Sequence, residues 1–296
     1  MLHEALTVAE SIGATPFAVE ACRELGYVEV QAGRAATAGR WLARAGMDAG
    51  EDRQRAKVLG VRGMALSDRA HYEAAIGLLS ESVAAAGVCA DRRQEAWSLA
   101  ILGRALLLRG HLRGAAGALD RSLELIAEEG WLALQPLPEA LRAEVALRAG
   151  ATDQASGLVR HAFALGCQLG DPCWEGFGAR ATGLVHRSRG EHRLALECFR
   201  DAVARSGRVA DGYVWLKAFC LDALAAHMIG QGDGAGAETV LEELETLAAR
   251  GDMRELLVRA AIHRARLGDA SALDGVRPLA EVIDNPVLDA ELANLA

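Results

Sequence analysis

Lysine is almost missing from this sequence of 296 residues, in which only Lys57 and Lys217 occur. Neither ends a GxxxxGK[ST] phosphate-binding loop, and the GxSxG and HExxH motifs of hydrolases are missing as well. No pair of cysteines has the spacing of metal ligands. We therefore predict no catalytic residue, no metal site and no cofactor, and we expect that the chain is not an enzyme.

The cysteines, the apolar runs and the net charge limit the kinds of protein that this chain can be. The six cysteines are scattered, which is typical of reduced thiols in a cytoplasmic protein. No apolar run reaches the roughly 18 residues of a membrane span. The net charge of -8 disfavours a broad nucleic-acid contact, because such a contact needs clustered basic residues. We expect a cytoplasmic chain that contacts neither a membrane nor nucleic acid directly.

The sequence does contain a repeat. A small residue, here called the anchor, recurs at intervals of 37, 40, 40, 40, 42 and 36 residues. A glycine or alanine stands seven positions after each anchor. In every repeat but the last, an alanine follows at twelve and a large apolar residue at sixteen. The anchors are Gly26, Gly63, Gly103, Ala143, Gly183, Ala225 and Ala261. Such a period is typical of stacked helical repeats.

Helix packing explains this spacing. Two antiparallel helices approach closely only where both carry small side chains, here Gly103 and Ala115. Leu119, one turn further, then fills the space beside them. Gly110, between the two helices, supplies the positive φ that ends the first one. Because glycine inside a helix costs about 1 kcal/mol relative to alanine, four anchor glycines at one register indicate a packing requirement.

The anchor, the alanine and the large apolar residue together resemble the tetratricopeptide (TPR) repeat. The resemblance covers about residues 16 to 250 well and 252 to 284 loosely. The period near 40 exceeds the family's period of about 34, and the aromatic residue three positions after the anchor is missing. The long period is similar to the repeat region of large ATP-binding LuxR-type bacterial transcriptional regulators. The resemblance implies an all-α fold, an αα-superhelix of about seven helix-turn-helix repeats with a concave face.

We predict a single helical-repeat domain over residues 1–296. Counting 21 positions back from Gly26 reaches Ala5, which is the register of Ser82 and Ser122 in later repeats. Residues 1–15 are therefore expected to be part of the second helix of a preceding repeat, in a chain excised from a longer protein. A short N-terminal capping helix is the alternative. Residues 252–296 are expected to form an irregular last repeat.

Proline and aspartate mark several expected helix starts. We expect the first helix of the fourth repeat to begin near Pro138, since Pro136 and Pro138 stand at its start. Asp171 followed by proline is typical of an N-cap and the first helical position. The sixth repeat is expected to open near Asp211, and Asn285 to precede a last helix that reaches Leu295.

Two short patterns have the letters of functional motifs. Residues 176–181 match a dinucleotide-binding fingerprint, but they lie inside an expected helix with no strand before it, so we interpret them as helix packing. His186 and His192 flank the turn of the fifth repeat. A metal site there is the alternative to solvated turn residues, which we prefer.

The concave face offers candidate binding residues. In TPR folds the first helix of each pair lines this groove with the positions six and three before the anchor and one and four after it. Aromatic and arginine side chains at such positions are typical binding anchors, because they bury a large area or offer forked donors. The candidates are Trp97, Phe177 and Phe219 at six before, Arg23 and Arg180 at three before, and Tyr27 and Arg104 at one after. The alternative is that the aromatic residues are core and the arginines solvated.

We expect a non-catalytic scaffold that binds a protein segment, a peptide or a small effector in this groove. The resemblance implies the sensor segment of a LuxR-like regulator, a family with an NTPase module before the repeats and a DNA-binding module after them. A free-standing TPR adaptor for protein–protein assembly, or a homo-oligomer, is the alternative. An all-α enzyme is remote, because no DDxxD-like pair of carboxylates is present.

The register makes a prediction about stability. Ala115→Leu or Ala195→Leu should overpack the contact between the two helices of a pair and lower the melting temperature by several degrees. Thermal unfolding followed by circular dichroism measures this. An unchanged melting temperature for both variants would show that the repeat register is misplaced.

Overall fold

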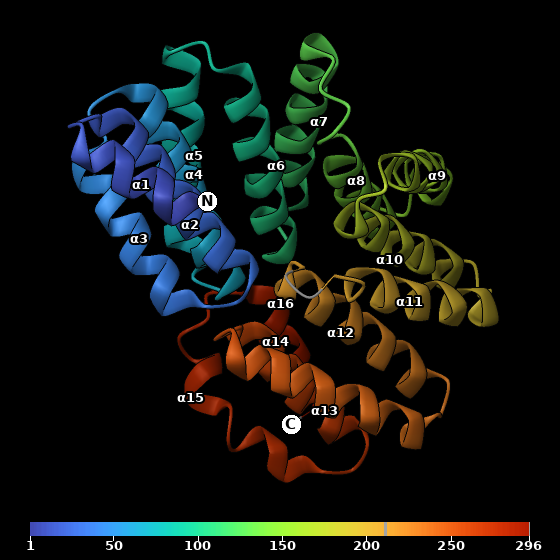
Figure 1. The fold of residues 1–296 in the computed structure, drawn as a ribbon. Helices are drawn as coiled ribbons and strands as arrows, with labels where there is room; N and C mark the ends of the chain where they lie inside the picture. The colour runs from blue at the N-terminus through green and yellow to red at the C-terminus, as the bar shows by residue number, and fades with distance from the viewer. Residues whose placement is uncertain (210–211, 296) are drawn as a thin grey trace.

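The computed structural model describes residues 1–209 and 212–295, which fold into a succession of helices (Figure 1). From α1 to α14 each helix packs against the next, and the expected pairs are α2 with α3, α4 with α5, α6 with α7, α8 with α9, α10 with α11 and α12 with α13. The helices are α1 (Leu2–Ser11), α2 (Thr15–Gln31), α3 (Ala35–Asp48), α4 (Asp52–Asp68), α5 (Tyr72–Val88), α6 (Arg92–Leu108), α7 (Leu112–Glu129), α8 (Pro136–Arg148), α9 (Thr152–Leu169), α10 (Pro172–Ser188), α11 (His192–Ser206), α12 (Val214–Gly230), α13 (Gly234–Arg250), α14 (Arg254–Arg266), α15 (Arg277–Ala280), α16 (Pro286–Ala293) and the 3₁₀ helix η1 (Ala270–Leu273). The predicted all-α repeat fold is confirmed.

The anchor glycines lie where the two helices of a pair come closest. A Cβ atom added at Gly103 would lie 2.5 Å from Cγ of Leu119, and one added at Gly183 would lie 2.7 Å from the Phe199 ring. Gly26 and Gly63 make the same approach to the residue sixteen positions later, at 2.6 Å in both cases. The alanine at the twelfth position, such as Ala115, is fully buried. The predicted contact between anchor and large residue is therefore present in every pair that has an anchor glycine.

All seven residues predicted to end a first helix have a positive φ. Six are glycines, and the seventh is Ala70, with a φ of 61°. An alanine in this left-handed region is strained, because its Cβ crowds the backbone. Ala70 is almost fully buried, so packing around the α4–α5 turn holds a conformation that the side chain disfavours.

The ends of several helices match the sequence signals closely. The Asp171 side chain accepts hydrogen bonds from the backbone N–H groups of Cys173 and Trp174, which caps α10. Helix α8 begins at Pro136 and not near Pro138, because a proline fits the first helical turn, where no backbone donor is needed. Asp211 lies outside the described residues, and α12 begins at Val214. Asn285 caps α16, which ends at Ala293, before the predicted Leu295.

The two ends of the repeat array differ from its middle. In the last repeat a 3₁₀ turn and the four-residue α15 take the place of the second helix. At the other end, α1 packs against α2 through Leu6 and Ala9. Ala5 is exposed, whereas Ser82 and Ser122 at the same register are fully buried. That residues 1–15 continue a preceding repeat stays a prediction.

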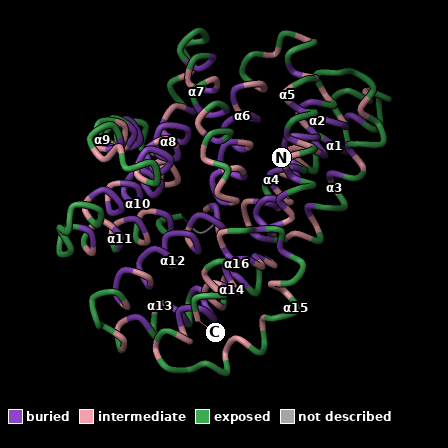
Figure 2. The backbone as a smooth tube through the Cα atoms, turned by 180° about the vertical axis from the view of Figure 1, so that it is seen from behind, coloured by how far each residue is buried: buried purple, intermediate pink, exposed green. Residues whose placement is uncertain are grey.

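The first helices of the pairs form the inside of the superhelix and the second helices its outside. Figure 2 shows burial around most of α8, α10 and α12, whereas α9 and α11 are largely exposed. Helix α13 buries one narrow stripe, which consists of Ala237, Leu241, Leu244 and Ala248. A first helix is covered by its own partner, by both neighbouring pairs and by the helices across the interior, and for this reason it is buried on nearly every side.

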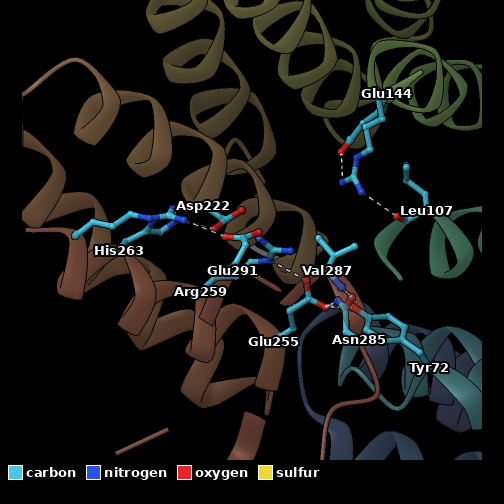
Figure 3. Close-up of polar contacts among 12 residues, drawn as sticks. Tyr72, Leu107, Glu144, Asp222, Glu255, Arg259, His263, Asn285, Val287 and Glu291 are labelled. Carbon is cyan, nitrogen blue, oxygen red and sulfur yellow. Dashed lines mark hydrogen bonds and ion pairs between the residues drawn. The ribbon is translucent and has the colours of Figure 1, made fainter. Parts of the chain in front are cut away.

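The superhelix turns back on itself until its last helices touch its second and third pairs (Figure 1). Tyr72 at the start of α5 donates to Glu255 of α14 over 2.5 Å, and Asn285 donates to the same carboxylate over 2.9 Å (Figure 3). Arg69 pairs with Asp252, and Arg109 pairs with Asp284. The contacts of Tyr72, Arg69 and Arg109 join residues more than 170 positions apart, so the concave face of the predicted superhelix is an enclosed interior.

The close contact between each anchor glycine and the residue sixteen positions later leads to a second prediction about thermal stability. Gly103→Ala should lower the melting temperature by several degrees, although alanine is the better helix former, because the added methyl overlaps the fully buried Leu119 side chain. Gly117→Ala is the matched control. It lies on the exposed side of α7 with nothing near its Cβ position, so the same change should stabilise the protein slightly. Equal effects of the two changes would contradict this account.

Candidate functional site

Two cavities of different chemistry lie on the inside of the superhelix. The first, the aromatic cavity, has a volume of about 240 Å³. Its walls come mainly from the first helices of the pairs and from the segment before α12, and they include Tyr27, Met64, Trp97, Arg104, Leu137, Trp174, Phe177, Tyr213 and Leu216. The second, the charged cavity, has a volume of about 840 Å³. Its walls include Glu144, Arg148, Arg180, Arg187, Phe219, Asp222, Arg259, His263, Arg266 and Glu291.

Half-buried aromatic side chains line the first cavity. Tyr27 of α2 and Trp97 of α6 meet edge to face, with ring centroids 6.3 Å apart. Trp174 and Phe177, on consecutive turns of α10, face each other at the same centroid distance. The Tyr27 hydroxyl accepts a hydrogen bond from Gln31, and burial raises the pKa of Tyr27 above its usual value, so this phenol stays protonated. The cavity therefore presents large apolar surfaces with few polar atoms.

A buried ion pair forms one wall of the aromatic cavity. Arg104 is 1% exposed, and its guanidinium donates to Asp68 over 2.6 Å and to the Tyr213 hydroxyl over 2.5 Å. Tyr213 in turn donates to the same Asp68 oxygen over 2.7 Å. This triad joins α4, α6 and the residue before α12. Removing one partner of such a pair costs several kcal/mol, since it leaves a buried charge uncompensated. The hydrogen bonds of Arg104 thus hold the walls of the cavity together.

Charged side chains from α8, α12, α14 and α16 face the second cavity (Figure 3), and α10 adds Arg180 and Arg187. Glu144 accepts from Arg180 over 2.7 Å and from Arg148 over 2.9 Å. Burial alone would raise the pKa of Glu144, but the two guanidinium groups outweigh this and lower it to about 2. The pKa of Asp222 is lowered in the same way. Burial opposes its ionisation, while the hydrogen bond from His263 and the charge of Arg259 lower its pKa to about 2. Both carboxylates are ionised at neutral pH.

Two stacked aromatic rings, with an arginine on each side, connect the two cavities. The guanidinium carbon of Arg104 lies 4.3 Å from the Trp215 ring centroid, and that ring stacks on Phe219 at 4.7 Å. The guanidinium carbon of Arg180 lies 3.5 Å from the centroid of Phe219. Cation–π contacts of this kind are worth more when they are desolvated, as here. One packed layer thus forms a wall shared by both cavities.

The predicted groove residues divide between these cavities. Tyr27, Trp97, Arg104 and Phe177 line the aromatic cavity, and Arg180 and Phe219 line the charged one. Arg23 lines neither, because it pairs with Glu20 and Glu24 on its own helix. Phe177, Phe219, Arg104 and Arg180 are themselves buried and so belong partly to the core. Whether any of the seven binds a ligand stays a prediction.

Several lining residues were missed by sequence reasoning. Arg187 stands four positions after Gly183, a groove position that the register marks, so the pattern could have found it. The residue one position after the anchor lines one of the two cavities in six of the seven repeats. Trp174 and Tyr213 stand nine and twelve positions before their anchors, outside the groove register. No sequence signal points to these two.

Helix packing and a local ion pair account for the two remaining sequence motifs. Gly176 and Gly178 lie inside α10, where a Cβ on Gly178 would come within 2.9 Å of the Phe163 backbone, so close helix packing accounts for them. His186 pairs with Glu191 beside the α10–α11 turn. Within residues 1–209 and 212–295, no group of three or more histidine, cysteine, aspartate or glutamate side chains could hold a metal ion. Over the same ranges, no helix has both the length and the apolarity to cross a membrane.

Comparison with known proteins supports the fold and goes no further. No family model and no curated protein matches the chain. Among solved structures it is similar to a Rap protein complexed with Competence and Sporulation Factor, with a TM-score of 0.67, 14% identity, and coverage of 94% of this chain and 88% of that one. The apo form of RapI has a TM-score of 0.48, 11% identity and coverage of 88% and 72%. A Podosopora anserina protein with nearly identical TPR-like repeats has a TM-score of 0.42, 17% identity and coverage of 68% and 97%. The first similarity shows a TPR-like array of helix pairs.

The lowered pKa of Glu144 predicts how stability depends on pH. A carboxyl with a pKa near 2 in the folded protein and 4.5 as the reference value stabilises the fold fully above about pH 5, and this contribution fades as the pH falls toward 2. The melting temperature of Glu144→Gln should therefore lie well below that of the unchanged protein at pH 7, with the gap shrinking at pH 3. The exposed Glu124→Gln is the control and should show little difference at either pH. A gap for Glu144→Gln that is constant with pH would refute the ion-pair account.

Proposed function

We propose that this chain is a non-catalytic scaffold that binds a peptide or protein segment on the inside of its superhelix. The aromatic cavity is the observation that carries the proposal. It is lined by half-buried Tyr27, Trp97 and Trp174, which join α2, α6 and α10 around one apolar space. Rigid aromatic side chains that converge on a concave site are typical binding anchors, since they bury a large area at low entropic cost.

The volume of the cavity favours a side chain as its occupant. Cavities for whole small molecules usually measure about 300–1,000 Å³, and the aromatic cavity is smaller, at about 240 Å³. A single apolar side chain of a bound segment suits this space. The neighbouring charged cavity leaves room for a further group of the same ligand or for a separate one.

Two further considerations support a binding role. A Rap protein of similar fold has been solved in complex with Competence and Sporulation Factor, so this architecture can hold a bound factor. The long repeat period resembles that of LuxR-type regulators, and we propose the sensor segment of such a regulator as the biological setting. A free-standing adaptor is the alternative setting. In either setting, binding would act by favouring one curvature of the superhelix over another.

Peptide selection tests the proposal. Peptides selected from a random library on the immobilised, unchanged protein should share an apolar residue, and Trp97→Ala should weaken their binding at least tenfold, measured by calorimetry. The same change should lower the melting temperature only modestly, because Trp97 is only half buried. Trp41→Ala, which removes an equally half-buried tryptophan on α3, is the control and should leave affinity unchanged. If no peptide is enriched, or if both changes weaken binding alike, the proposal fails.

A further inference from the structure

The charged cavity concentrates positive charge in an acidic chain. Its walls carry five arginines and three carboxylates, although the whole protein has a net charge of -8. Each of those carboxylates is already paired: Glu144 with Arg148 and Arg180, Asp222 with His263, and Glu291 with Arg259 and Arg266. Figure 3 shows how these side chains converge from α8, α12, α14 and α16. Arg259 also pairs with Glu255, just outside the cavity, so the five arginines exceed the four carboxylates that face them by one.

Arg187 is the arginine that remains without a partner. Among the described residues its guanidinium has no ion pair and no hydrogen bond, although the side chain is exposed and the charges of Glu144 and Asp222 reach it. Its guanidinium carbon lies 5.8 Å from the centroid of the Phe199 ring. Desolvation and the neighbouring charge of Arg180 lower the pKa of Arg187 from its ordinary value, and the carboxylates of Glu144 and Asp222 offset only part of this shift. A guanidinium beside another cation, with all its donors free, is disposed to accept an anion.

Arg180 adds unused donors at the same place. It is 6% exposed and lies two turns before Arg187 on the same face of α10. Its Nη1 donates to Glu144, and its guanidinium lies flat on Phe219, which fixes its position. Its Nε is buried and has no acceptor among the described residues. Burying a charged group with donors unsatisfied is costly, so a bound acceptor would stabilise this arrangement.

We propose that the charged cavity binds a phosphate group, with Arg187 and Arg180 as its donors. A phosphate carries close to two negative charges and three acceptor oxygens, so it can satisfy two guanidinium groups at once, whereas a carboxylate offers one charge. The phosphate is either free or part of a small effector, and about 840 Å³ of space accommodates both. The proposal rests on the side chains of the charged cavity and not on the proposed function.

Thermal unfolding with defined anions tests this site. Inorganic phosphate, phenyl phosphate and acetate are each added to the full chain at constant ionic strength, with chloride as the reference. The melting temperature should rise by about 3 °C at a phosphate concentration tenfold above its Kd. Arg187→Gln should fold normally, because Arg187 has no ion-pair partner among the described residues, and should lose most of that rise. A larger effect of phenyl phosphate would indicate a phosphorylated effector, and an equal one free phosphate.

Controls separate a specific site from a general salt effect. Arg160→Gln also removes one exposed arginine, from the outer helix α9, and should keep the full rise. Phosphate stabilises many proteins by exclusion from their surface, so an equal rise in the unchanged protein, Arg187→Gln and Arg160→Gln would overturn the proposal. An equal rise with acetate would overturn the choice of phosphate. Trp97→Ala should leave the rise intact, and its loss there would place the anion in the aromatic cavity instead.

Discussion

The close approach of a glycine to the large residue sixteen positions later is the contact on which this architecture depends. At Gly103 no room remains for even a methyl group beside Leu119, so the two helices of the pair can pack in only one register. The same approach recurs at Gly63 and Gly183. Because each pair has nearly the same geometry, the first helices turn the same positions inward, and the residues just after the anchors line the interior.

The interior is shaped by polar contacts as much as by apolar ones. Arg104 is buried against Asp68 and Tyr213, and Arg180 against Glu144. Between the two arginines lie Trp215 and Phe219, stacked face to face. A buried guanidinium keeps its hydrogen-bonding directions and stacks on aromatic rings, which a lysine would not do as well. The near absence of lysine from the sequence is consistent with an inside built from forked, planar cations.

The shared wall also has a mechanical consequence. A ligand that moves Arg180 would press on Phe219, then on Trp215 and Arg104, which borders the aromatic cavity. Such coupling requires two arrangements of this layer with different affinity for each ligand. Closure of the superhelix through Tyr72, Glu255 and Asn285 joins the second repeat to the last one, so a change of curvature would have to rearrange these contacts.

The sequence by itself determined the helix pairs, their turns and the inward-facing register. These depend on contacts within about twenty residues, such as that between Gly103 and Leu119, and a local period records them directly. Even the place of Arg187 could be read from the register. Only the tertiary structure decided that the superhelix closes, that Arg23 pairs locally, and that Tyr213 reaches Asp68. These outcomes depend on small rotations summed over all repeats and on contacts as distant as 183 positions. No local pattern records such a sum, because each repeat constrains only its neighbours.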